Sequence, residues 1–259
     1  MKKYFGLVLL IGMVVFWWQG VFAKQEPILP EEEGVYSVHG RPDLKLRIFV
    51  YKEKPETQKG KPVPSPVPIC GLTDNDSLAV DNSAGWHLPA IFEYTLNPSS
   101  VPSSIISNVA EITDLSFDAW IGALDLGKVA ISKNPVNTTV SRAVFDGQNI
   151  VTWGRTSGSA LGVTYIWYDN TGLAVEVDTI MNKKFSWSWT PYNISNLCSV
   201  QNTYDAQNIL THEIGHWFGL DDHYTTEYQE NTMYGYGSKN EVKKDTLTIG
   251  DVLGLNLIY

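Results

Sequence analysis

The sequence predicts an α+β domain in which several β-strands and a few helices share one core. Short runs rich in β-branched and aromatic residues are separated by Gly, Asn and Asp, which is typical of strands and turns. Two longer segments, 105–120 and 205–218, carry apolar residues at helical spacing. With 259 residues, 43% of them hydrophobic, the chain is long enough for one sizeable core and marginal for two. We therefore expect one main domain with short N-terminal additions.

The N-terminus has the layout of a secretory signal peptide. Two lysines precede an apolar run from Tyr4 to Trp18, and Val21 and Ala23 stand at positions −3 and −1 of a cleavage site. The alternative is an uncleaved membrane anchor, although polar residues interrupt the run and no basic stop-transfer cluster follows. We assign residues 1–23 to the signal peptide and expect a secreted protein with no stable membrane association after cleavage.

Residues 24–68 are expected to form an N-terminal segment that ends in a linker. A strand-like run from Leu44 to Tyr51 is followed by recurrent proline between Pro55 and Pro68, a composition typical of extended linkers. We place the domain boundary there, with the main domain over residues 69–259. Whether residues 24–68 are a short propeptide that is removed stays open.

The main domain begins with alternating strand and helix signals. A strand from Ile91 to Leu96 precedes a helix that Ser99 or Ser100 can cap and that continues to Trp120. A later helix covers 205–218, and a capping pair, Thr248 with Asp251, precedes a final helix. Between them we expect strands that are bounded by turn residues and whose last two members form a hairpin: 128–131, 149–153, 163–168 and 173–177.

The charge of the chain argues against nucleic acid as a partner. The formal net charge is −9 and the isoelectric point is about 5.0, so no basic surface is available to follow a phosphate backbone. We expect a monomer whose partner is a polypeptide substrate, on the grounds given next.

The most informative segment is His212-Glu213-Ile214-Gly215-His216, inside the second helical region. Residues four apart share one face of a helix, so the two imidazoles can bind a single metal ion. Glu213 is turned away from that direction, which lets its carboxylate act as general base toward water. A chain of this composition contains about 0.005 such matches by chance. The alternative is a structural role for both histidines, but packing alone gives little reason for this spacing.

The residues after the helix extend the motif. Gly219 permits the left-handed turn that ends a helix and returns the chain toward the metal. With it, the segment resembles the metzincin metallopeptidases, whose pattern is His-Glu-x-x-His-x-x-Gly-x-x-His or Asp. The third-ligand position falls on Asp222, in a run similar to that of snapalysin and related microbial enzymes, where the ligand is aspartate. Most matrixin-like members carry histidine there, so neighbouring His223 is the alternative third ligand.

This resemblance implies a metzincin-like catalytic domain: a twisted, mostly parallel sheet with an antiparallel edge strand, an active-site helix, a methionine turn and a C-terminal helix. Met233 would form the floor beneath the metal without binding it, or would be an ordinary core methionine. The strand from Leu161 to Tyr168 would be the rim that pairs with extended substrate, or an ordinary edge strand. The cofactor would be one catalytic Zn²⁺, and nothing in the sequence supports or excludes structural calcium.

Two cysteines, Cys70 and Cys198, leave two interpretations open. The segment 68–74, Pro-Ile-Cys-Gly-Leu-Thr-Asp, is similar to the matrixin propeptide switch, in which a thiolate occupies the zinc, but its arginine is missing. An even cysteine count in a secreted chain favours a disulfide instead.

Two functions from different classes remain. The first is a secreted zinc metalloendopeptidase that hydrolyses peptide bonds with Glu213 as general base. The second is a secreted binding or adhesion module that retains the fold and captures zinc weakly. Turnover of a peptide library separates them.

Overall fold

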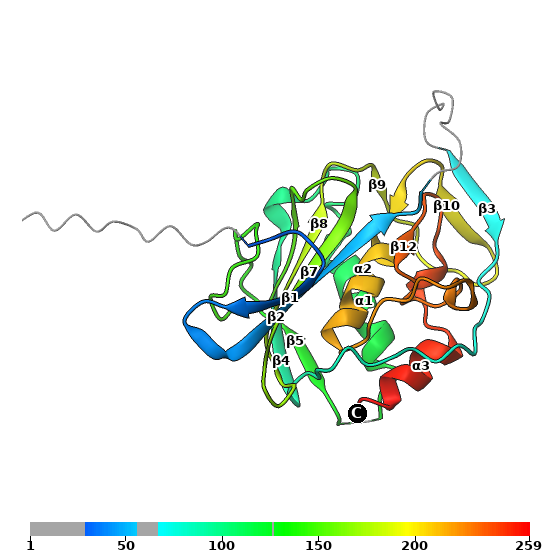
Figure 1. The fold of residues 1–259 in the computed structure, drawn as a ribbon. Coiled ribbons are helices and arrows are strands. Elements are labelled where there is room, and N and C mark those ends of the chain that lie inside the picture. The colour runs from blue at the N-terminus through cyan, green and yellow to red at the C-terminus, as the bar shows by residue number, and fades with distance from the viewer. Residues whose placement is uncertain (1–28, 56–66, 126) are drawn as a thin grey trace, which may run out of the picture.

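The computed structural model describes residues 29–55, 67–125 and 127–259, so the expected signal peptide and most of the proline-rich linker lie outside the described residues. The described residues form a mixed eight-stranded sheet, two small two-stranded sheets and three α-helices (Figure 1). Along the main sheet the strand order is β1-β2-β7-β8-β6-β4-β5, with β12 beside β2. Its strands are β1 (Gly34–Val38), β2 (Arg41–Glu53), β4 (Ile91–Asn97), β5 (Ala130–Lys133), β6 (Ile150–Gly154), β7 (Ala160–Asp169), β8 (Ala174–Asn182) and β12 (Tyr236–Gly237).

The remaining elements lie around this sheet. The helices are α1 (Val109–Ile121), α2 (Ala206–Trp217) and α3 (Ile249–Asn256), with short 3₁₀ turns η1 (Pro98–Ser100), η2 (Thr226–Tyr228) and η3 (Lys243–Asp245). The small sheets pair β3 (Pro68–Leu72) with β10 (Leu197–Val200), and β9 (Trp187–Ser188) with β11 (Tyr204–Asp205). Helices α1 and α2 pack against each other, and α2 also contacts β7 and β8. This arrangement confirms the predicted α+β class.

The strand directions confirm a mostly parallel sheet, but the antiparallel strand that was expected at its edge lies inside the sheet. Strands β4, β5, β6 and β8 run parallel, whereas β7 is antiparallel to both of its neighbours, β8 and β2. The strand expected as an open rim is therefore not an edge. The register with β2 runs from Leu44 opposite Asp169 to Lys52 opposite Ala160, so the N-terminal segment covers the whole outer side of β7. In Figure 1, β2 is the long blue strand beside β7, in front of α2.

The core lies on both faces of the sheet and shows the alternation expected of a buried strand. Phe49 and Tyr51 of β2 belong to the large cluster on the helix side, whereas Ile48 and Val50 belong to a smaller cluster on the other side. The strand-like run noticed in the sequence is thus buried on both faces.

The helices follow the predicted order, with one late start. The segment expected to open the first helix instead makes successive turns, and α1 begins at Val109. Ser100, one of the two expected caps, instead donates to the carbonyl of Trp153, and Ser104 donates to that of Trp187. Before α3, Thr248 and Asp251 form the predicted capping box.

The two cysteines are joined in a disulfide that ties β3 to β10. Cys70 therefore has no free thiol, and the thiolate-switch interpretation is wrong for this structure. Within the described residues, no helix combines the length and the apolar character that crossing a bilayer requires.

Candidate metal centre

Helix α2 carries the two predicted histidines on one buried face. Asp205 caps its N-terminus by accepting from the backbone N–H groups of Gln207 and Asn208. The side chains of His212 and His216 are fully buried, and their ring centroids lie 4.9 Å apart. The i, i+4 spacing therefore places both imidazoles over the same volume, as the sequence predicts.

Each imidazole is held by a hydrogen bond to a backbone carbonyl. Nδ1 of His212 lies 2.7 Å from the oxygen of Thr232, and Nδ1 of His216 lies 2.9 Å from the oxygen of Leu220. A carbonyl can only accept, so each Nδ1 carries a proton, and Nε2 is the nitrogen of each ring that can offer a lone pair to a metal ion. Burial lowers the pKa of His216 to about 3, which keeps that ring neutral.

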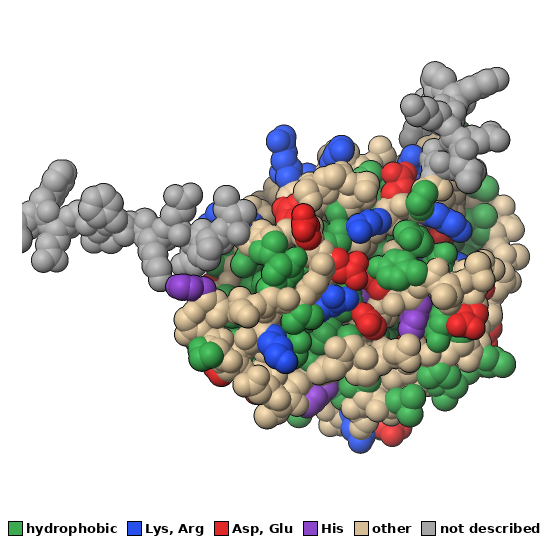
Figure 2. Space-filling model, in the orientation of Figure 1, with side chains coloured by type: hydrophobic (Ala, Val, Ile, Leu, Met, Phe, Trp, Pro, Cys, Tyr) green, Lys and Arg blue, Asp and Glu red, His purple; other side chains and the backbone are tan. Residues whose placement is uncertain are grey.

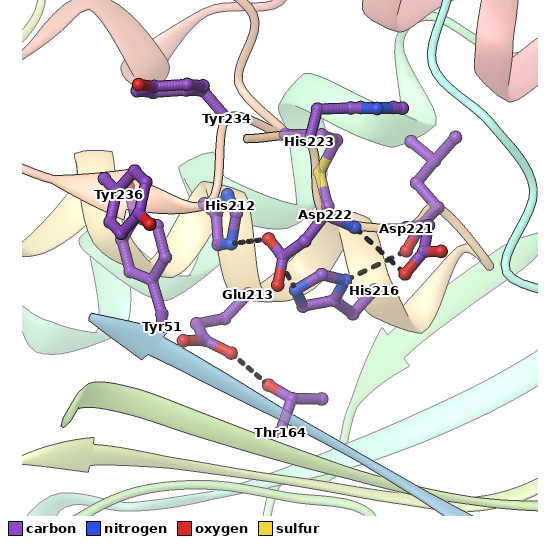
Figure 3. A network of polar contacts seen from close by, with 12 residues as sticks. Tyr51, Thr164, His212, Glu213, His216, Asp221, Asp222, His223, Tyr234 and Tyr236 are labelled. Atoms are coloured by element: carbon purple, nitrogen blue, oxygen red, sulfur yellow. Dashed lines mark hydrogen bonds and ion pairs between the residues drawn. The ribbon is translucent and has the colours of Figure 1, made fainter. Parts of the chain in front are cut away.

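The chain reverses immediately after α2. Gly219 has a φ of +94°, and a Cβ there would collide with the carbonyl of Trp86, so the turn needs glycine. The reversal brings Asp222 back over the helix, with Oδ1 3.2 Å from Nε2 of His212 and 3.7 Å from Nε2 of His216 (Figure 3). The predicted ligand set therefore converges, with its ligand atoms within 4.8 Å of one another.

The three converging atoms share an unusual property. Nε2 of both histidines and Oδ1 of Asp222 are buried, and none has a hydrogen-bond partner among the described residues. A buried carboxylate thus faces two nitrogen lone pairs, an arrangement that a cation would stabilise and that is otherwise costly.

Glu213 points away from these atoms toward β7. Its Oε2 accepts a 2.5 Å hydrogen bond from the hydroxyl of Thr164, and its Oε1 is buried without a partner among the described residues (Figure 3). Gly162 lies beside it, where any Cβ would collide with Oε1. Burial, reinforced by the charge of Asp222, raises the pKa of Glu213 to about 8. The carboxylate is therefore free of the ligand set and poised to exchange a proton.

Met233 lies beneath the helix, as the resemblance implies for the methionine turn. Its side chain is fully buried, with the sulfur against Gly215 between the two histidines in sequence. The turn also supplies the Thr232 carbonyl that orients His212. Asp251 of α3 holds the turn by accepting from the N–H groups of Thr232 and Met233.

His223 lies outside the centre. Its Nε2 accepts from the backbone N–H of Asn82 at 3.2 Å and lies 3.4 Å from Oδ1 of Asp81. Its ring stacks on Tyr228 with centroids 3.8 Å apart. The structure therefore brings Asp222, and not the alternative ligand His223, to the two histidines.

Two aromatic residues of β2 cover the centre, and the sequence did not point to them. Phe49 stacks on His216 with ring centroids 3.7 Å apart, and Tyr51 stacks on His212 at 3.8 Å. The alternation of Arg47, Phe49 and Tyr51 is visible in the sequence, but nothing in it says which surface that face of the strand meets.

Lys244 is a second residue that sequence reasoning missed. It is fully buried, and its Nζ donates to the hydroxyl of Tyr51 and to the carbonyls of Tyr234 and Tyr236, at 2.7 and 3.0 Å for the carbonyls. Burial lowers the pKa of Lys244 to about 8, although Glu241 at 3.5 Å opposes this shift. In the sequence it is one of two adjacent lysines, which are typical of exposed surface.

The surface around β2 carries both signs of charge. In Figure 2, acidic and basic side chains are interspersed on the described part of this face, and no basic stripe crosses it.

No protein-family model matches the chain, and no curated protein matches it either.

Proposed function

We propose that this chain is a secreted zinc-dependent endopeptidase whose metal ligands are His212, His216 and Asp222. The observation that carries the proposal is the convergence of three buried ligand atoms that lack hydrogen-bond partners among the described residues. Two imidazole nitrogens and one carboxylate oxygen are a common protein ligand set for catalytic zinc.

The spacing of the ligand atoms supports zinc in particular. Zinc binds nitrogen and oxygen at about 2.0–2.2 Å, so tetrahedral ligand atoms lie roughly 3.4 Å apart. The distances from Asp222 to the two histidines, 3.2 and 3.7 Å, bracket this value. Three protein ligands also leave a coordination position open, which is typical of catalytic rather than structural zinc.

The surrounding residues support hydrolysis. The two backbone carbonyls that hold Nδ1 of the histidines would fix the rings for metal binding. Zinc held there would supply Lewis acidity that acidifies water and polarises a peptide carbonyl. Glu213 would take a proton from the attacking water and pass it to the leaving amine, while Thr164 orients its carboxylate.

The order of elements adds support from the resemblance. Strand β4, helix α1, strands β5 to β8, helix α2, the turn at Met233 and helix α3 follow the chain order that the metzincin resemblance implies.

The test compares Glu213→Gln with Glu227→Gln, an exposed glutamate near the site, as matched control. Zinc content is measured by elemental analysis, and turnover is measured on a quenched peptide library before and after limited proteolysis of the sample. Glu213→Gln should lose about 100- to 10,000-fold in activity and keep its zinc, because only the base is changed. Chelation should abolish the activity of the parent protein and of the control. Full turnover by Glu213→Gln would reject the assignment of the base.

A further inference from the structure

The candidate metal centre is closed by the chain itself. The side chains of His212, Glu213 and His216 have no exposed surface, and Phe49 and Tyr51 stand over the two imidazoles. A peptide bond of a substrate cannot reach the ligand atoms while these two rings are in place. The element that carries them therefore decides access to the centre.

That element, β2, lies in a slot between two other strands. On one side it pairs antiparallel with β7 over most of its length. On the other side it pairs antiparallel with β1, which belongs to the same N-terminal segment, and its end pairs parallel with β12. The strand is extended, and its alternate side chains point at the centre. An extended peptide that adds to a sheet edge uses the same main-chain hydrogen bonds and the same alternation of pockets.

Tyr51 is held by the most specific contact along the strand. Its ring lies on His212, and its hydroxyl accepts from the buried ammonium of Lys244. The other two hydrogen bonds of Lys244 go to backbone carbonyls of the segment that includes β12. A buried ammonium needs its acceptors, and Tyr51 adds a third hydrogen bond to the two that the backbone carbonyls supply.

Arg47 closes the same face further along. Its guanidinium lies 4.3 Å above the ring of Phe49 and 3.5 Å from the carboxylate of Asp221, beside the third ligand. It also pairs with Glu33 at 3.1 Å, which links the residues before β1 to the face of β2 that lies over the centre. Arg47, Phe49 and Tyr51 thus form one continuous face over the centre.

We propose that β2 occupies the substrate cleft of this chain as an intramolecular peptide ligand, and that the peptidase is latent until β2 leaves. This inference rests on the proposed function. The connection from β2 to β3 passes through the proline-rich stretch of the sequence. A single cut between these two strands therefore removes the covalent link between β2 and the residues that follow. A substrate that takes the place of Tyr51 should offer Lys244 an acceptor at the end of its side chain, a phenol or a carboxylate.

The experiment uses the full chain with a site-specific protease sequence inserted between β2 and β3, loaded with zinc and studied before and after the cut. Three quantities are followed: hydrogen exchange of the β7 amides, the rate at which excess chelator removes zinc, and turnover of a peptide library. Before the cut, all three should be low and independent of protein concentration, because the ligand is tethered.

After the cut, dilution should release the strand. The β7 amides should lose protection, zinc removal should accelerate at least tenfold, and specific activity should rise with dilution. A synthetic peptide of residues 29–55 should reverse all three effects. The same peptide with Tyr51→Phe should reverse them less well, because it lacks the hydroxyl that Lys244 contacts. A peptide with Lys52→Ala, changed at an exposed side chain of the same strand, is the matched control.

Each outcome decides between the ideas. Release of β7 with unchanged zinc removal and unchanged turnover overturns the latency proposal and leaves the peptidase standing. Persistent protection of β7 after the cut and dilution also overturns it, because β2 is then a permanent strand. Accelerated zinc removal without turnover in any form supports occupancy of the cleft by β2 and rejects the endopeptidase.

Discussion

Two buried clusters of histidine and carboxylate contain the consecutive residues Asp222 and His223, one in each cluster, and their polar atoms are satisfied in different ways. In the candidate metal centre, Asp222 joins His212 and His216, and the facing atoms receive no hydrogen bond from the described residues. In the second cluster, which we call the Asp251 brace (Asp81, His223, Asn231 and Asp251), each of the acidic and imidazole side chains accepts at least one hydrogen bond, although Oδ2 of Asp81 and Oδ1 of Asn231 have no partner among the described residues.

The brace shows what a structural cluster looks like in this protein. The carboxylate of Asp251 accepts from the backbone of Thr232, Met233 and Thr248 and from the hydroxyl of Thr248. His223 receives a backbone N–H. Where backbone and side-chain groups donate hydrogen bonds to these residues, the residues link segments of the fold. Where such donors are missing, the same residue types can bind a cation. Residue type alone therefore does not distinguish a metal ligand from a structural residue.

The largest difference between the clusters should appear in metal affinity. Asp222→Ala should weaken zinc binding by at least about 100-fold, more than the loss of an outer partner costs, because a direct ligand is gone. His223→Ala is the matched control, with zinc affinity unchanged and stability lowered by about 1–2 kcal/mol through the lost packing and hydrogen bond. Competition against a zinc indicator measures both. Equal losses in the two variants would remove the distinction between the clusters.

The brace should respond mainly in stability. Asp251→Ala removes the acceptor of several buried N–H groups, so the free energy of unfolding should fall by about 2–4 kcal/mol. Zinc affinity should fall by only about tenfold, through the Thr232 carbonyl that orients His212. Denaturant unfolding and zinc titration give the two values, with exposed Asp125→Ala as control. A larger effect on zinc than on unfolding would mean that the brace belongs to the metal centre.

The smallest expected effect, taken per pH unit, is on the pH dependence of the free energy of unfolding. Burial, together with the adjacent charge of Asp251, raises the pKa of Asp81 well above its ordinary 3.8. The folded state therefore holds a proton that the unfolded chain releases, so the stability from this group is complete below about pH 4 and is lost as pH rises through neutrality.

Asp81→Asn removes that titration. The free energy of unfolding, measured by denaturant between pH 5 and pH 9, should fall less steeply in the variant, by at most about 1.4 kcal/mol per pH unit. An unchanged slope would show that Asp81 is already ionised in the folded protein.

Local patterns accounted for much of the fold. The hairpin of β7 and β8, the extent of α2 and the capping box of α3 all depend on short stretches of sequence, and the structure confirms them. The predicted start of α1 was wrong: Ser100, one of the two expected caps, donates to the distant carbonyl of Trp153, and the helix begins only at Val109. Local propensity gives way there to tertiary contacts.

In the site, too, the residues fixed by local spacing were predicted and those fixed by distant contacts were not. Spacing along one helix and its turn identified His212, Glu213, His216 and the place of Asp222. Thr164 and the cover formed by β2 belong to strands remote in sequence, and strand pairing carries no local signature of its partner. Lys244 was missed because its burial depends on Tyr51, which lies far away in the chain.

The absence of a side chain at position 162 has a consequence for how relatives of this protein should be sought. The carboxyl of Glu213 fits against β7 only because that strand offers bare backbone at the point of contact. A sequence signature written on the helix alone would accept chains whose facing strand leaves no room for a glutamate at the position of Glu213. Adding the requirement for a glycine in that strand would give a two-segment signature that also selects for the position of the Glu213 carboxyl group.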